Sequence, residues 1–248
     1  MEKKIVIALF VIAAFILSKN GWPLIGYEGS GEWGRILISL LNRSFWYLLL
    51  PCLVLAFLYR PKHVSEELGV QKGAREGWQL AFWATLPMLL GYGFMANFNV
   101  SWSWSTVILS CAMAALGEEV LYRGFFFGQL HRRVGLPFVL AAGASAIFFG
   151  IGHLYQGNGW AQTAGIFAVT FAGALWFSWL YKAWDNNLWV PIGLHFLMNL
   201  YWSIFQVGDN ALGGMLPNVF RAATIAITVW LTLRRQRQQQ AQQTSLEV

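Results

Sequence analysis

Two adjacent carboxylates and an arginine inside a long apolar segment constrain this chain more than any other feature. Glu118, Glu119 and Arg123 lie within the apolar stretch 104–130. At ~1.5 Å per residue, a helix of this length can cross the ~30 Å hydrocarbon core of a bilayer. Ionisable groups are costly in hydrocarbon, so they are rare there and usually functional. The stretch is therefore predicted to be a transmembrane helix that carries charge near its middle.

Helical geometry predicts different tasks for the two glutamates. Adjacent residues project about 100° apart on a helix, so the two carboxylates face different neighbours. Glu119 and Arg123 are four residues apart with the acid first, which is the favourable order for an ion pair. Glu119 is predicted to hold and neutralise Arg123, which leaves Glu118 free for chemistry. The alternative interpretation is a purely structural ion cluster between helices.

Composition places the chain among integral membrane proteins. Of its 248 residues, 57% are hydrophobic and only 11% are charged, more apolar surface than a soluble domain of this size could bury. The predicted fold is an all-α bundle of about eight transmembrane helices with an intramembrane polar active-site cavity. The predicted spans are roughly 5–27, 36–59, 78–98, 104–130, 136–155, 160–181, 188–206 and 216–233.

One domain is predicted to cover residues 1–233, with a motif-bearing core at about 104–206. The Gln-rich tail 234–248 is predicted to be cytoplasmic and disordered. Its last residues, 246–248, resemble the start of a vector-encoded protease site and are set aside. Arg221, in the eighth span, has no predicted role beyond reaching outward or pairing with Glu119.

The distribution of basic residues predicts the topology, because Lys and Arg collect in cytoplasmic loops. With eight spans, one side carries Lys3, Lys4, Arg60, Lys62, Lys72, Arg75, Arg132, Arg133, Lys182, Arg234, Arg235 and Arg237. The other side carries only Lys19, Arg35 and Arg43. Both termini are therefore predicted to be cytoplasmic, in a multi-pass protein of a bacterial cytoplasmic membrane. The net charge of +6 is explained by topology rather than by binding of nucleic acid.

Two histidines in later spans extend the set of intramembrane polar groups. His153 ends the span 136–155 one turn after Phe149, and His195 precedes Asn199 by one turn. A lone histidine in a span is usually hydrogen-bonded packing. A polar cavity is the simplest explanation for the whole set, since unpaired polar groups cannot face lipid.

These side chains permit hydrolysis. A glutamate in a dry cavity can act as a general base toward water, and a neutral histidine can hold that water or protonate a leaving amine. Asn and His donors can stabilise an oxyanion. No serine stands in a nucleophile elbow and no HExxH motif occurs. A zinc-activated water, with Glu118, His153 and His195 as ligands, is the alternative.

Three motifs follow one another on successive hydrophobic spans, within 104–202. They are Glu118-Glu119-x-x-x-Arg123, Phe149-x-x-x-His153 and His195-x-x-x-Asn199. Together they resemble the signature of the CPBP family (CAAX protease and bacteriocin-processing, or Abi) of intramembrane glutamic-type endopeptidases. The resemblance implies cleavage of a membrane-bound protein or peptide substrate at a site within the bilayer.

The resemblance also implies roles for the matching residues. Glu118 would activate water with His153 assisting, and His195 and Asn199 would stabilise the oxyanion. Glu119, Arg123 and Phe149 would support them. A metal-free reaction without a cofactor is favoured, because no cysteine or third histidine accompanies the set.

Three other functions fit parts of the same pattern. Intramembrane Glu and His groups also serve proton-coupled transporters as relays. His153 and His195 are the residue type that binds haem in a bis-histidine site. A catalytically silent family member would act as a scaffold or immunity factor. The pattern predicts neither the substrate nor the oligomeric state.

Overall fold

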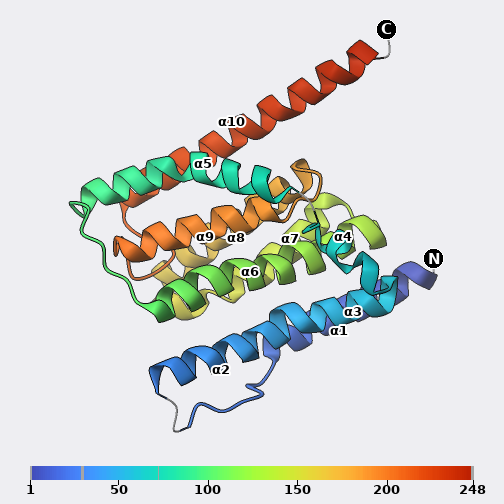
Figure 1. Cartoon of the computed structure of the whole chain (residues 1–248), viewed down its shortest axis with the longest axis horizontal. Coiled ribbons are helices and arrows are strands. Elements are labelled where there is room, and N and C mark those ends of the chain that lie inside the picture. The colour runs from blue at the N-terminus through green and yellow to red at the C-terminus, as the bar shows by residue number, and fades with distance from the viewer. Residues whose placement is uncertain (1, 29–30, 72, 247–248) are drawn as a thin grey trace.

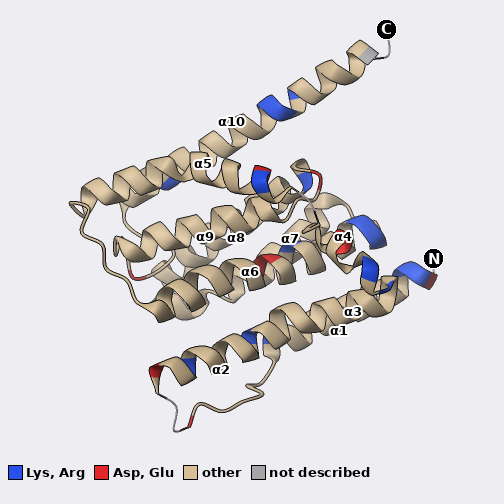
Figure 2. Ribbon diagram, in the orientation of Figure 1, with Lys and Arg blue, Asp and Glu red and all other residues tan. Residues whose placement is uncertain are grey.

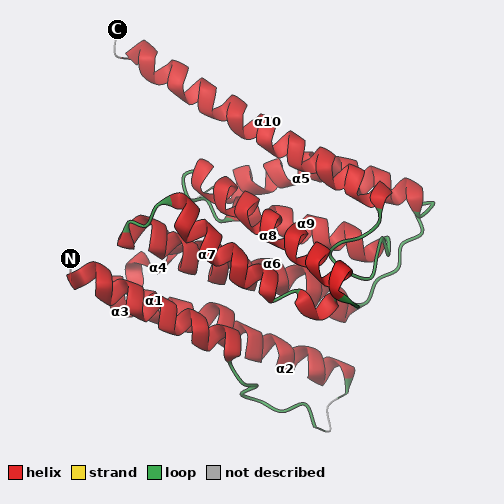
Figure 3. Cartoon of the chain, turned by 180° about the vertical axis from the view of Figure 1, so that it is seen from behind, coloured by secondary structure: helices red, strands yellow, loops and turns green. Residues whose placement is uncertain are grey.

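The computed structural model describes residues 2–28, 31–71 and 73–246 as a bundle of helices joined by loops, and these residues contain no strand (Figures 1 and 3). The long helical segments are α1 (Glu2–Asn20), α2–η1–α3 (Glu32–Ser44, Phe45–Leu49, Leu50–Tyr59), α5 (Ala74–Met95), η3–α6–η4–η5 (Thr106–Met113, Ala114–Glu118, Glu119–Phe127, Leu130–Val134), α7 (Phe138–Ile151), α8 (Trp160–Ala183), α9 (Trp189–Ile204) and α10 (Met215–Leu246). The predicted all-α membrane fold is confirmed.

Four segments of the described chain are long and apolar enough to cross a bilayer. They are Glu32–Tyr59, Phe138–Gln156, Trp160–Ala183 and Met215–Ser245. The other predicted spans also contain helices, although α1 ends at Asn20 within the predicted span 5–27, and they do not meet this test of length and hydropathy. Most Lys and Arg residues lie toward the end of the bundle that holds the N-terminus (Figure 2).

The helix that carries the two glutamates lies inside the bundle. It has α9 on one side, and α1 and the α2–η1–α3 segment on the other (Figure 1). Beyond α9, α5 packs against both α9 and α10, while α7 packs against α8. Side chains from the glutamate helix can therefore contact partners in two layers of the bundle.

Much of the glutamate helix is π-helical, and α6 ends at Glu118 while η4 begins at Glu119. In a π-helix the backbone hydrogen bonds run from i to i+5, so the turn is wider than in an α-helix. Such segments are frequent at functional sites. The sequence pattern predicted a helix here but not this geometry.

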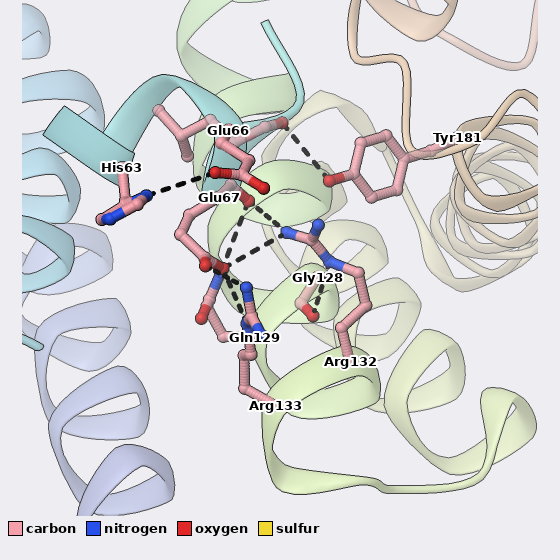
Figure 4. Close-up of polar contacts among 9 residues, drawn as sticks. His63, Glu66, Glu67, Gly128, Gln129, Arg132, Arg133 and Tyr181 are labelled. Atoms are coloured by element: carbon pink, nitrogen blue, oxygen red, sulfur yellow. Dashed lines mark hydrogen bonds and ion pairs between the residues drawn. The ribbon is translucent and has the colours of Figure 1, made fainter. Parts of the chain in front are cut away.

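The segment 60–77, interpreted from the sequence as an interfacial loop or amphipathic turn, contains the 3₁₀ turn η2 (Pro61–His63) and the short helix α4 (Val64–Leu68). Its Glu67 is only 2% exposed. The Glu67 carboxylate accepts hydrogen bonds from Gln129 Nε2 at 3.2 Å and Arg133 Nε at 3.0 Å, and it is also paired with Arg132 (Figure 4). These contacts hold α4 against the end of the glutamate helix.

The C-terminal tail differs from the predicted disorder. Helix α10 continues to Leu246 and projects away from the bundle (Figure 1). Arg, Gln, Ala and Leu are good helix formers, which accounts for helix beyond the packed region. Arg235 Nη2 donates to Asp185 Oδ2 at 2.8 Å near the start of the tail. Residues 247–248, and Lys72 of the topology prediction, lie outside the described residues.

Glu67→Ala should lower the free energy of unfolding by about 1 to 3 kcal/mol, because it removes the carboxylate that accepts from Gln129 and Arg133 and that pairs with Arg132. The loss stays moderate because the Arg133 side chain is 43% exposed and becomes solvated. Thermal unfolding in detergent measures it. The neighbouring Glu66→Ala is the matched control, since the Glu66 side chain is 54% exposed. Equal losses in the two variants would contradict the structural role of Glu67.

Candidate active site

The ion pair predicted within the glutamate helix is present. Arg123 Nη1 donates to Glu119 Oε1 at 2.8 Å, and both residues are fully buried. The Arg123 guanidinium carbon also lies 4.6 Å from the ring centroid of Phe149 and 5.3 Å from that of Phe177. Aromatic faces attract a cation, and the attraction is stronger where water is excluded. Phe149 therefore supports Arg123 directly, from helix α7.

The same oxygen of Glu119 binds His195, a contact that the sequence pattern did not predict. His195 Nδ1 lies 2.7 Å from Glu119 Oε1 and joins α9 to the glutamate helix. Because an ionised carboxylate can only accept, Nδ1 is the donor. Glu119 thus positions two side chains at once, one on its own helix and one on α9.

Asn199 lies one turn after His195 and contacts the other half of the glutamate helix. Its Nδ2 donates to the backbone carbonyl of Ser110 at 3.0 Å. Ser110 belongs to the π-helical segment η3. This bond fixes the amide of Asn199 on the α9 face that also carries His195.

His153 lies just beyond the last residue of α7, in the turn before η6 (Leu154–Gln156). The α-helix of the predicted span 136–155 therefore ends at Ile151. His153 Nδ1 donates to the backbone carbonyl of Phe149 at 2.7 Å, and the two rings lie 4.5 Å apart. The partner of Nδ1 is a carbonyl here, whereas the partner of Nδ1 in His195 is a carboxylate.

Glu118 is half-buried and points to different neighbours from Glu119. Its carboxylate has no hydrogen-bond partner among the described residues, and it interacts electrostatically with Lys19, Tyr47 and Tyr122. These residues belong to α1, η1 and η4. The structure therefore separates the two glutamates, as their spacing on a helix predicts.

Direct contacts join Glu119, Arg123, Phe149, His153 and His195 into one connected group, whereas Glu118 and Asn199 lie outside these contacts. Several buried polar atoms of the group have no partner among the described residues: Glu119 Oε2, Arg123 Nε and Arg123 Nη2. The group retains hydrogen-bonding capacity for water or substrate.

The described residues include no group of three His, Cys, Asp or Glu side chains arranged to hold a metal ion. The alternative zinc set of Glu118, His153 and His195 is therefore not assembled in this arrangement. A cavity of about 510 Å³ lies elsewhere, and its lining includes Glu66, Arg132 and Asp185 but none of the predicted site residues.

Arg221 does not pair with Glu119. Its Nη1 donates to the carbonyl of Ala211 at 2.9 Å, and its guanidinium carbon lies 4.4 Å from the Trp202 ring centroid. These contacts hold the loop before α10 against α9, so the residue has a structural explanation.

Arg123→Ala should lower the free energy of unfolding by about 3 to 5 kcal/mol, because it leaves the buried Glu119 carboxylate without its cation. Thermal unfolding of the purified variant in detergent measures the loss. The double variant Arg123→Ala/Glu119→Gln should recover part of it, since the unpaired charge is gone. A double variant no more stable than the single one would contradict this cause.

Comparisons with known proteins concern the same segment of the chain. Residues 100–201 match the model of the family described as type II CAAX prenyl endopeptidase Rce1-like. A curated relative, "Putative membrane peptidase YdiL" of Bacillus subtilis (strain 168), is 31% identical over 101 residues. That alignment covers 41% of this chain and 37% of the relative, so the chain spans little more than a third of the relative's length. No solved structure matches.

Neither the family match nor the relative supports the transporter alternative. All three motifs fall within the matched segment, and the resemblance to the CPBP family is confirmed there. Over residues 100–201, this membrane protein is therefore similar to the Rce1-like family of type II CAAX prenyl endopeptidases.

Proposed function

We propose that this chain is an intramembrane endopeptidase that hydrolyses peptide bonds of membrane-associated proteins or peptides. One observation carries the proposal: the Nδ1 partner is a backbone carbonyl for His153 and a carboxylate for His195. Each bond fixes the orientation of one ring and leaves its Nε2 available, and hydrolysis needs both a proton acceptor and a hydrogen-bond donor. The family match and the relative named as a peptidase support the same class of reaction.

His153 suits the acceptor role. With Nδ1–H donated to the Phe149 carbonyl, the neutral ring presents the lone pair of Nε2. That nitrogen can accept a hydrogen bond from a water molecule and orient it. Glu118, whose carboxylate has no hydrogen-bond partner among the described residues, is the general base that takes the proton.

His195 suits the donor role. The carboxylate of Glu119 accepts from Nδ1 and fixes the ring, and when Nε2 also carries a proton, that N–H can donate to an oxyanion. Asn199, one turn along α9, supplies a second donor. Each such donor is worth about 10²- to 10³-fold in turnover in known sites.

The reaction then follows from these roles. Glu118 takes a proton from water as the oxygen attacks the scissile carbonyl carbon, and His195 and Asn199 stabilise the negative oxygen that forms. The intermediate collapses with cleavage of the C–N bond, and Glu118 returns the proton to the leaving amine. Arg123 acts through Glu119, which it neutralises. No metal or other cofactor takes part in the proposed steps.

The proposal also covers the location of the substrate and the membrane topology of the enzyme. The substrate is a protein or peptide in the lipid bilayer, and the enzyme is a multi-pass protein of a bacterial cytoplasmic membrane with both termini cytoplasmic. The excess of basic residues at one end of the bundle supports that orientation (Figure 2).

Glu118→Gln should reduce cleavage by about 10²- to 10⁴-fold, the usual contribution of a general base. The assay treats a mixed library of membrane peptides with purified protein in detergent, with and without a strong chelator, and detects products by mass spectrometry. Glu66→Gln is the control, since Glu66 is an exposed glutamate outside the site. Full activity in Glu118→Gln would remove Glu118 as the base. Loss on chelation, restored by zinc, would overturn the metal-free mechanism.

His195→Ala should abolish detectable cleavage while the protein remains folded, because it removes one donor to the oxyanion. The turnover of a product peptide found in the library and the melting temperature are measured together. His131→Ala is the control, because His131 lies outside the site and its Nδ1 also makes a hydrogen bond, to the carbonyl of Leu136 at 2.9 Å. A His195→Ala enzyme with wild-type turnover would exclude the oxyanion role.

A further inference from the structure

Lys19 is a charged residue that neither the motifs nor the family segment includes. It is the penultimate residue of α1, which packs into the bundle through Phe15, only 1% exposed. The Phe15 ring stacks on that of Phe126, with centroids 3.9 Å apart. This packing sets the end of α1 beside the glutamate helix.

The Lys19 ammonium lies between the Glu118 helix and the His153 turn. Its Nζ is 5.4 Å from the ring centroid of Tyr122, which follows Glu118 by one helical turn and shares its face. On the other side, the Lys19 nitrogen lies close to Gly152, the residue before His153. A Cβ atom built on Gly152 would be 3.1 Å from it. An electrostatic interaction joins Lys19 to Glu118.

The other groups around Glu118 are neutral or have partners elsewhere, so Lys19 is the cation that can compensate its charge. Tyr47 of η1 and Tyr122 of η4 are neutral phenols, and His153 donates Nδ1–H to a carbonyl. Tyr155 and Arg43 both interact with Tyr47, and the Arg43 guanidinium donates to the Leu109 carbonyl at 3.0 Å. The Arg123 guanidinium is paired with Glu119.

We propose that Lys19 is a positioning residue of the active site, which compensates the charge of Glu118 and holds its carboxylate beside His153. A charge in apolar surroundings is costly unless it is paired, and Glu119 already has Arg123 for this purpose. Each glutamate thus has its own cation, one from the same helix and one from α1. The inference rests on the proposed function and places a site residue outside the family segment 100–201.

The first test compares turnover of one library-derived product peptide by full-length wild type, Lys19→Met and Lys19→Arg. Lys19→Met should lower kcat at least about 10-fold with KM changed less than about 2-fold, the pattern expected when only the chemical step suffers. Lys19→Arg should recover most of the loss, because it restores the charge. Lys4→Met is the matched control: Lys4 is at the other end of α1, and its Nζ likewise lies beside a loop glycine, Gly135.

Three outcomes would overturn the proposal: kcat of Lys19→Met within about 2-fold of wild type, an equal loss in Lys4→Met, or a Lys19→Arg variant as slow as Lys19→Met.

A second readout needs no substrate. Melting temperatures of Lys19→Met, Glu118→Gln and the double variant form a cycle, and a paired Lys19 and Glu118 should give non-additive shifts. Additive shifts would contradict the pair. If wild type cleaves nothing while the shifts are non-additive, the protease proposal fails and the electrostatic coupling of Lys19 to Glu118 stands.

Discussion

The carboxylate of Glu119 is the contact on which the rest of the site depends. One of its oxygens accepts from Arg123 at 2.8 Å and from His195 at 2.7 Å, which joins the glutamate helix to α9 within a fully buried region. A buried charge is tolerated only with partners, so these bonds restrict the rotation of all three side chains. Asn199, one turn along the same helix, is positioned by the same docking of α9.

The two neighbouring glutamates show how one helix serves two layers of the bundle. Glu119 faces α9, and its Oε1 accepts from both Arg123 and His195. Glu118 faces α1 and η1, and its carboxylate has no hydrogen-bond partner among the described residues. A well-paired carboxylate makes a poor base and a good support, and a less encumbered one can accept a proton. Different packing around identical side chains is the basis for the different roles proposed for the two glutamates.

The parts that local spacing decides were predictable from the sequence. The helices follow from apolar runs, and the Glu119–Arg123 pair follows from an i, i+4 relation on one helix. The Glu119–His195 bond joins residues 76 positions apart, so it depends on how α9 docks. Glu67 and Lys19 were assigned to loops or interfaces because charge and position suggest exposure, and only tertiary packing buries the first and turns the second inward. The π-helical backbone around Glu119 has no sequence signal of its own.

The proposed reaction is hydrolysis by water in a membrane-embedded site, and peptide cleavage in water enriched in oxygen-18 would detect it. Purified full-length protein in lipid nanodiscs would be incubated with a library of membrane peptides, and the products would be read by mass spectrometry. Hydrolysis should give new C-termini that carry the heavy oxygen. Intact peptides, together with uptake into proteoliposomes that collapses with the proton gradient, would contradict it.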